Sequence, residues 1–403
     1  MTVRDVLRVR EFRAVLASSG LSILGDQVAR IAVALLVFER TGSELAASAT
    51  YACSYLTWLV SGPLLASLAD RQQRRRLMVQ CDLLRGALVA VLLVPGLPLW
   101  ALYAVLVLVG LLSPPFDAAK SALLPEMLKG DLYVAGSAVQ SAVFQGAHVG
   151  GFLLGGVLVA VSSAQVALAL DALTFLVSAA LLQFLVLERP LARAERRSLA
   201  RDTHEGIALV ASDPLLRRLL AYGVVGSLAM IVPEGLAVPV SEGLGGGPMT
   251  AGVLTAAVPA GFLVGSFCIL RIPVVRRPAL LAPLTVLACI PLLLTPLVHS
   301  SPVVVALWVL TGAASAVGLV ANALYMVTVP AEARGRAFGL ANSTLMAVQG
   351  AFLLVAGALA ELVTPLQAVG VAGVAVLAGA LLLALRPSAQ LERAVPAVRT
   401  STT

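Results

Sequence analysis

The sequence predicts an all-α polytopic membrane protein whose membrane-spanning helices occupy nearly the whole chain. Of its 403 residues, 59% are hydrophobic and 12% are charged, and the mean hydropathy is +0.97. Soluble domains have about 45–50% apolar residues and about 25% charged residues. The apolar runs are about 20 residues long and do not alternate with polar residues, which favours spanning helices over a transmembrane barrel.

Twelve such runs follow one another along the chain. The first follows a segment with four arginines and has no small-residue cleavage site, so we expect it to be retained as the first span. We therefore expect twelve transmembrane helices. The runs cover residues 14–38, 46–69, 77–95, 98–115, 136–161, 165–187, 215–238, 250–270, 279–297, 303–327, 338–361 and 366–386.

The distribution of basic residues predicts the orientation of these helices. Of 28 Lys and Arg, only Arg30, Arg40 and Arg85 lie within spans or at their outer ends. The others lie in the terminal segments, in the even-numbered loops or at span ends beside them, and such basic loops face the cytoplasm. We therefore expect both termini to be cytoplasmic. The net charge of +7 is confined to these short segments, so we expect no nucleic-acid partner.

The longest polar segment, 188–213, divides the chain into two halves of six predicted spans each. We expect an N-terminal half at 1–187, a cytoplasmic linker with an amphipathic helix at 188–213, a C-terminal half at 214–386 and a disordered cytoplasmic tail at 387–403. A 205-residue offset also reveals a weak internal repeat between equivalent loops. It pairs Pro125 with Pro330, Lys129 with Arg334 and Gly130 with Gly335. Repeated halves of the same orientation occur in transporters.

The loop at 62–76 carries a charge pattern that resembles a known signature. Asp70 and Arg71 are followed by Arg74 and Arg75, as in the loop between spans two and three of the major facilitator superfamily. Ala66 and Gln73 stand where that signature has glycines. Further similarity to the branch containing the enterobactin exporter and the macrolide-efflux proteins is found in Leu24-Gly25-Asp26, Asp82-x-x-Arg85, Pro115 to Lys120, Leu124-Pro125, Val329-Pro330 and Arg334-Gly335-Arg336. The resemblance implies two six-helix halves and export driven by protons.

Ionisable residues inside the spans are candidates for a proton and substrate pathway, because a charge in the bilayer core is costly unless it is paired or hydrated. Asp26 and Arg30 are four residues apart, hence on one face of the first span. Asp26 either titrates during transport or forms a permanent ion pair. The candidate residues of this pathway are Asp26, Arg30, Arg85, His148 and Glu234. Asp171 and Glu361, near outer span ends, are expected to be interfacial.

A second set of charged residues lies nearer the cytoplasmic face and is expected to form a gate. Asp82 is expected to pair either with the basic loop or with Arg85. Asp70 would hold the cytoplasmic side shut by meeting basic groups or a helix N-terminus. The expected gate consists of Asp70, Arg71, Arg74, Arg75, Asp82, Asp117, Lys120 and Arg334.

These features predict a secondary exporter of a small amphipathic compound in the bacterial inner (plasma) membrane, acting by alternating access and proton antiport. We expect a monomer whose partners are the substrate, protons and the lipid bilayer. Four scattered cysteines, expected to be small core residues, and three scattered histidines indicate no disulfide, metal site or cofactor. A lipid or lysophospholipid flippase and a non-transporting receptor or assembly protein remain alternatives. A membrane-embedded enzyme would need clustered His, Asp or Glu, which the chain lacks.

Overall fold

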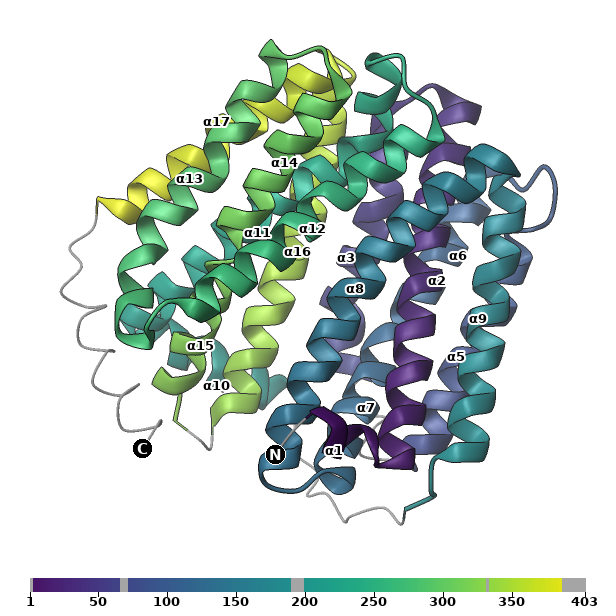
Figure 1. The fold of residues 1–403 in the computed structure, drawn as a ribbon, viewed down its shortest axis with the longest axis vertical. Helices are drawn as coiled ribbons and strands as arrows, with labels where there is room; N and C mark the ends of the chain where they lie inside the picture. Colours follow the sequence, from purple (N-terminus) through teal and green to yellow (C-terminus); the bar gives the residue numbers. More distant parts are fainter. Residues whose placement is uncertain (1–2, 66–71, 190–198, 331–332, 386–403) are drawn as a thin grey trace. The chain divides into compact units, whose positions relative to one another are not determined.

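The computed structural model describes residues 3–65, 72–189, 199–330 and 333–385, and within these ranges it contains helices and no strand. The chain divides into two units (Figure 1). The first unit comprises residues 1–41 and 53–196, and the second comprises 42–52 and 197–403. This division differs from two consecutive halves, because residues 42–52 are grouped with the second unit. The predicted boundaries at 187 and 214 therefore stay a prediction.

The first unit is built around one long helix, α2 (Arg10–Thr41), which packs against α8 (Asp131–Val161) and α9 (Ala164–Leu185). Its interior is filled by buried apolar side chains such as Met78, Phe116 and Leu182. The remaining helices are α1 (Val3–Leu7), the larger part of α3 (Glu44–Leu65), α5 (Arg74–Val91), α6 (Leu99–Leu111) and α7 (Ser113–Met127).

Glycines let α8 approach α2 closely. A Cβ added to Gly151 would lie 2.7 Å from the Leu24 carbonyl oxygen, and one added to Gly155 would lie 3.0 Å from the Cα of Val28. Such small residues allow helix backbones to pack together in a membrane, where no hydrophobic effect drives helices to associate. The face of α2 that carries Leu24 and Val28 therefore packs closely against α8.

The second unit contains the rest of the helices, and local sequence signals fix several of their starts. Asp213 caps α11 by accepting a hydrogen bond of 2.8 Å from the Leu215 N–H, and Thr364 forms a capping box with Gln367 at the start of α17. The helices are α10 (Leu199–Ser212), α11 (Pro214–Gly243), α12 (Pro248–Arg271), η1 (Val274–Leu280), α13 (Leu281–Leu294), η2 (Thr295–Leu297), α14 (Ser301–Ser315), α15 (Gly318–Thr328), α16 (Arg334–Ala360) and α17 (Pro365–Ala384).

Within the described residues, ten helical segments are long and apolar enough to cross a membrane. Two of the twelve predicted spans, which correspond to α3 and α5, are not among them. The helix α5 carries five charged residues in 18, and α3 carries seven Ser, Thr and Tyr side chains in 22. Both helices are therefore more polar than an ordinary span, and the number twelve stays a prediction.

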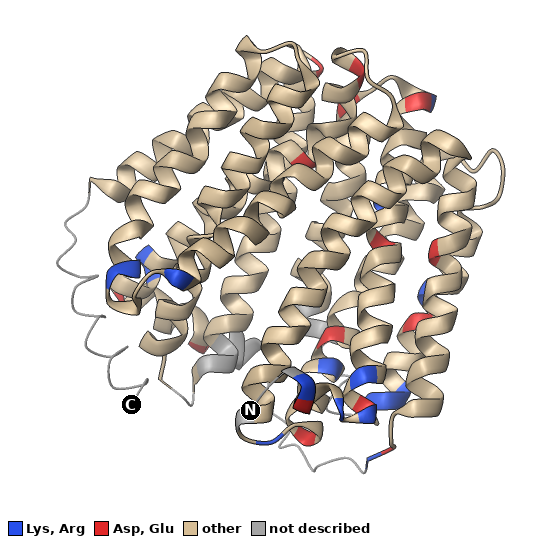
Figure 2. Ribbon diagram, in the orientation of Figure 1, with Lys and Arg blue, Asp and Glu red and all other residues tan. Residues whose placement is uncertain are grey.

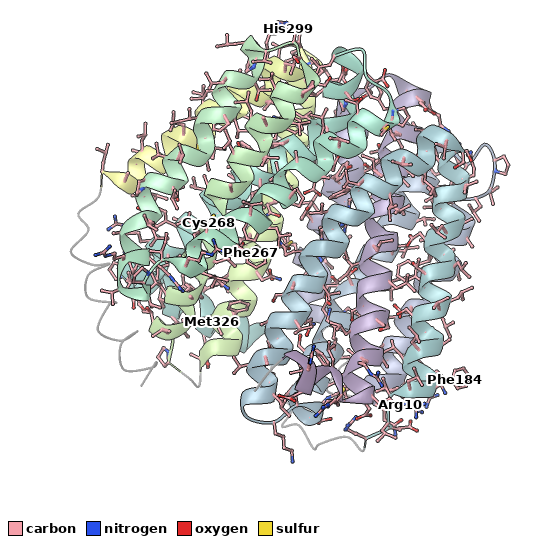
Figure 3. The ribbon with its side chains drawn as sticks, viewed as in Figure 1. Arg10, Phe184, Phe267, Cys268, His299 and Met326 are labelled. Carbon is pink, nitrogen blue, oxygen red and sulfur yellow. The ribbon has the colours of Figure 1, made fainter. Side chains whose placement is uncertain are left out.

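Apolar side chains also cover the outer faces of the helices, as lipid contact requires. Phe184 is 82% exposed and Phe267 is 59% exposed, and both side chains project outward, as does Met326 (Figure 3). Cys268 is exposed on α12 and is not a core residue, contrary to expectation. Large exposed apolar surfaces of this kind are typical of sites that contact a membrane or another protein.

Candidate functional site

The helices α2, α5, α7 and α9 of the first unit bring together ionisable side chains that are far apart in the sequence. In Figure 2, charged residues gather where α5 begins and α7 ends, whereas the helix middles are mostly uncharged. A smaller group lies deeper and is called the intramembrane cluster here. It consists of Asp26, Arg30, Asp82, Arg85, Asp117, Lys120 and Asp171.

The most deeply buried part of this cluster is the pair Asp82 and Arg85, one turn apart on α5. Asp82 is 0% and Arg85 4% exposed, and Asp82 Oδ1 lies 3.9 Å from Arg85 Nη1. Ser178 Oγ donates a hydrogen bond of 2.5 Å to Asp82 Oδ2. The Arg85 guanidinium also lies over the rings of Phe116, at 5.1 Å, and Phe175, at 5.7 Å. These contacts join α5 to α7 and α9.

A second ion pair of the cluster is formed on α7. Lys120 Nζ lies 2.6 Å from Asp117 Oδ1, one turn earlier on the same helix. The ammonium group is also 5.7 Å from the centre of the Phe116 ring, so Phe116 contacts both Arg85 and Lys120. Lys120 is buried, and its cation is stabilised by the carboxylate and the ring together.

Asp26 and Asp171 complete the cluster from α2 and α9. Asp26 interacts electrostatically with Arg85, Arg30 and Asp117, and Asp171 interacts with Asp26 and Arg85. Asp171 is 1% exposed, so the expectation that it is interfacial was wrong. Although it lies early in α9, it packs against Gly25 of α2, which has no side chain to keep it away.

His148 and Arg30 lie beside this cluster and each contacts a different neighbour. Gln27 Nε2 lies 3.3 Å from His148 Nε2, and His148 Nδ1 lies 3.3 Å from the Phe144 carbonyl oxygen. A neutral ring with its proton on Nδ1 satisfies both contacts, because the amide donates to Nε2 and Nδ1 donates to the carbonyl. The Arg30 guanidinium lies 5.7 Å from the centre of the Tyr55 ring.

The other predicted site residues are not placed in this cluster. Glu234 is partly exposed on α11 of the second unit, beside Pro233. Arg334 is the first residue of α16, but its side chain lies outside the described part of the structure. Asp70 and Arg71 also lie outside the described residues. Their roles in a gate therefore remain predictions.

Arg74 and Arg75, both predicted gate residues, bind other parts of the first unit. Arg74 Nη1 donates to the Ala122 carbonyl oxygen at 3.0 Å and forms an ion pair with Glu126. Arg75 Nη2 lies 3.0 Å from Glu188 Oε2, and its Nη1 donates to the carbonyl of Val186 at 3.2 Å. The two arginines thus tie the start of α5 to the ends of α7 and α9.

Sequence reasoning did not identify the acidic partners of these two arginines or the third basic residue, Arg189, that joins them. Arg189 Nη2 lies 2.6 Å from Glu11 Oε2, and Arg189 Nε lies 3.7 Å from Glu126 Oε2. Glu11 also accepts a hydrogen bond of 2.6 Å from the Leu187 N–H. Glu11, Glu188 and Arg189 lie just outside the ends of predicted spans, and Glu126 lies in a predicted loop; an acid next to basic residues was the available signal. Among the described residues, no group of three or more His, Cys, Asp or Glu side chains could hold a metal ion.

The long apolar helices define a polytopic helical membrane protein with charged side chains inside its first unit. The family model of the Major Facilitator Superfamily matches residues 15–346. The chain therefore belongs to this superfamily.

Two bacterial proteins are similar to it in sequence over part of its length. The uncharacterized MFS-type transporter YfiS of Bacillus subtilis (strain 168) is 29% identical over 255 residues, which cover 62% of this chain and 61% of that protein. Macrolide efflux protein A of Streptococcus pyogenes is 27% identical over 124 residues, which cover 29% of this chain and 31% of that protein. The matches thus span less than two thirds of either relative.

Solved structures share the fold over almost the whole chain. A POT family transporter matches with a TM-score of 0.76 at 12% identity, covering 93% of this chain and 96% of that one. The nucleoside transporter NupG matches with a TM-score of 0.74 at 12% identity, covering 93% and 98%. At these identities the likeness concerns the fold alone.

Proposed function

We propose that the protein is a secondary exporter of a small amphipathic compound, such as a drug, an antibiotic or a siderophore-like molecule, that works by proton antiport. In this proposal the chain crosses the plasma membrane of a bacterium twelve times, with both termini in the cytoplasm. Two six-helix halves alternate access to a central site. The family membership and the similarity to a macrolide efflux protein support this proposal.

The observation that carries the proton coupling is the intramembrane cluster of the first unit. Charged groups inside a membrane are costly, and in transporters they mark ion and proton pathways. Asp26 is partly exposed, unlike Asp82 and Asp171, which are fully buried. Asp117 is also partly exposed but forms an ion pair with Lys120, so Asp26 is the carboxyl group of the cluster that is best placed to exchange a proton during the transport cycle. Arg30, Arg85 and His148 would adjust the proton affinity of Asp26, and Glu234 would be a second acid of the pathway, in the C-terminal half.

The proposed cytoplasmic gate involves the charged residues at the end of the first unit. Arg74 and Arg75 already bind carbonyl oxygens and carboxylates of the same unit. We therefore assign them the task of holding the helix ends together. We assign the gating role to Asp70, Arg71 and Arg334, together with Asp82, Asp117 and Lys120.

The apolar character of the second unit favours an amphipathic substrate. Apart from Arg218 and Glu234, residues 214–243 of α11 have charged side chains only near the helix ends, and α13, α14, α15 and α17 have none. A site partly lined by such helices would recognise apolar surface rather than many hydroxyl groups. A lysophospholipid flippase satisfies the same condition and is the second candidate.

The test is substrate efflux from an efflux-deficient bacterial host, first with a panel of toxic compounds that includes a macrolide. We expect the protein to lower susceptibility to at least one compound, and a protonophore to abolish the effect. Asp26→Asn should remove the dependence of efflux on the pH gradient in inverted vesicles while the protein stays in the membrane at its normal amount. Glu242→Gln, a change at the exposed end of α11, is the matched control and should leave efflux unchanged.

Three results would contradict the proposal. Efflux in the Asp26→Asn variant that still follows the pH gradient would exclude Asp26 as the coupling group. Translocation of a fluorescent lysophospholipid without efflux of any toxic compound would favour the flippase. A protein that moves neither class of compound would instead be the non-transporting receptor.

A further inference from the structure

The intramembrane cluster contains an unequal number of acidic and basic groups. Its acids are four aspartates, and its cations are two arginines and one lysine. Two of the acids are each beside a cation of their own helix: Asp82 beside Arg85 and Asp117 beside Lys120. Arg30 is the remaining cation and interacts electrostatically with Asp26, and the remaining carboxyl group is that of Asp171, which interacts with Asp26 and Arg85. If all the aspartates were ionised, the buried cluster would hold one uncompensated negative charge.

The packing of α2 on α9 places the carboxyl group of Asp171 against the α2 backbone next to Asp26. A Cβ at Gly25 would collide with Asp171 Oδ1 and with Thr174 Oγ1, so Asp171 lies directly against the residue that precedes Asp26. Thr174 Oγ1 lies 3.3 Å from the same oxygen, Asp171 Oδ1, and so fixes that carboxyl group one turn along α9. The position of Asp171 is therefore set by the packing of the two helices.

A second observation shows that the cations of the cluster do not satisfy its acids fully. Asp82 Oδ1 and Arg85 Nε are both buried, and neither has a hydrogen-bond partner among the described residues. The Arg85 guanidinium lies 3.9 Å from Asp82 Oδ1, which is longer than a direct hydrogen bond. Arg85 also interacts electrostatically with both Asp26 and Asp171. Its charge is thus divided among three carboxyl groups rather than committed to one.

We propose that Asp26 and Asp171 form a proton-binding site that holds one exchangeable proton between them. The pair then carries a single negative charge, which Arg30 compensates, and the cluster as a whole is neutral. Two carboxyl groups that share a buried site do not ionise together, and their protons are bound and released as properties of the pair. Release of the shared proton would create a buried net charge, and uptake would remove it.

This site deepens the proposed proton antiport and rests on it for its part in transport, but the proton itself can be detected without transport. The groups around the pair come from each helix packed against it. They are Arg30 on α2, Asp82 and Arg85 on α5, Asp117 and Lys120 on α7, and His148 on α8. His148 is satisfied as a neutral ring by its two contacts, so it adds no charge to the balance.

The experiment is infrared spectroscopy of the purified full-length protein in lipid nanodiscs. The signal is the C=O stretching band of protonated carboxyl groups, identified by its shift in D2O. We expect Asp26→Asn and Asp171→Asn each to lose the same component of this band at pH 7, equal to one proton per chain. The double variant should lose no more than either single variant. Glu361→Gln, at an exposed position after α16, should keep the component.

Retention of the component in Asp171→Asn would overturn the proposal, because Asp26 would then hold the proton alone. Retention in Asp26→Asn, or a loss in the double variant that is twice that of the single variants, would overturn it as well. These readouts do not use efflux, so a shared proton in a protein without proton-driven efflux would refute the antiport and leave the site intact.

A measurement on the unaltered protein covers the case in which Asp171→Asn does not fold. A hydrophobic carbodiimide forms an adduct with protonated carboxyl groups buried in a membrane, and peptide mass spectrometry locates the adduct. We expect one adduct per chain, on Asp26 in some molecules and on Asp171 in others, and less adduct at high pH. Adducts on both residues of one chain, or on neither, would overturn the proposal.

Discussion

The helices inside the first unit and the helices inside the second unit are joined by different kinds of contact. In the first unit, ion pairs and hydrogen bonds join helices in the interior, as between Asp82 of α5 and Ser178 of α9. In the second unit, helices are joined by close approach of their backbones, the kind of contact that also joins α8 to α2 in the first unit. A Cβ added to Gly261 or Gly265 of α12 would collide with the carbonyl oxygens of Val309 and Ala313 of α14, and one added to Gly312 of α14 would collide with the Val258 carbonyl.

The first unit therefore contains a network of several buried acids and cations, whereas the helices of the second unit are joined mainly by close packing. Close backbone packing depends on shape and is insensitive to pH. A buried network of acids and cations responds to the gain or loss of one proton, because the cost of an unpaired buried charge is several kcal/mol. Proton coupling is therefore expected to reside in the first unit. Substitutions in each half test whether the two kinds of contact differ in this way.

The largest effect is expected in the second unit for Gly312→Val. Its side chain would occupy the space of the Val258 carbonyl and the Phe262 amide nitrogen, so α12 and α14 would have to separate. We expect a loss of more than about 4 kcal/mol, enough to prevent recovery of folded protein. Fluorescence-detected size exclusion measures the monodisperse fraction in detergent.

Gly226→Ala on α11 is the matched control, because no atom lies within 4 Å of an added Cβ there. It should leave the monodisperse fraction unchanged. A Gly312→Val protein as monodisperse and as heat-resistant as the unaltered one would show that α12 and α14 do not make backbone contact.

A smaller effect is expected in the first unit for Arg85→Gln. This change leaves Asp82, which is 0% exposed, beside no cation of its own helix. Removal of one partner of a buried ion pair costs about 3 kcal/mol. We expect a lower melting temperature, and partial recovery in the double variant Arg85→Gln/Asp82→Asn, in which no charge is left unpaired. Equal melting temperatures for the single and double variants would show that the two side chains are not coupled.

The smallest effect is expected for Glu361→Gln, where an exposed contact is removed. Glu361 Oε1 accepts hydrogen bonds from Ser43 Oγ at 2.6 Å and from the Leu45 N–H at 3.1 Å, both at the start of α3. These bonds, that of Ser43 first, lower the pKa of Glu361 from its ordinary value of 4.5. Because the folded-state pKa is the lower one, this contribution to stability is fully present above pH 4.5 and is lost as the pH falls through the lowered pKa.

The measurement is the melting temperature of Glu361→Gln and of the unaltered protein at several pH values. We expect a slight decrease at pH 7 that vanishes at acidic pH. A difference that instead grows as the pH falls would contradict the assigned hydrogen bonds.

Much of the fold follows from patterns along the chain. Long apolar runs predict the helices, since each satisfies its backbone internally, and ten of them are confirmed as candidate spans. The repeat was a poorer guide to local structure. Gly130 and Gly335 are paired by the 205-residue offset, yet Gly130 precedes α8 with φ of +57° and Gly335 lies within the helix α16. A shared motif therefore did not mean a shared conformation.

The composition of the intramembrane cluster was only partly predictable. Asp26 and Arg85 are conspicuous because they interrupt apolar runs, and the pairing of Asp82 with Arg85 follows from their spacing of three on one helix. The place of Asp171 depends on how α9 lies against α2, and no spacing along the sequence encodes a contact between residues so far apart. The ion pairs of Glu11 and Glu126 were missed for the same reason.

The contact between Glu11 and Arg189 also has a consequence for synthesis. The two residues are 178 positions apart: Glu11 lies in the first turn of α2, and Arg189 follows the end of α9. During translation, which releases about 5–20 residues per second, Glu11 emerges many seconds before its partner. The ion pair between Glu11 and Arg189 can therefore form only after α9 has been synthesised.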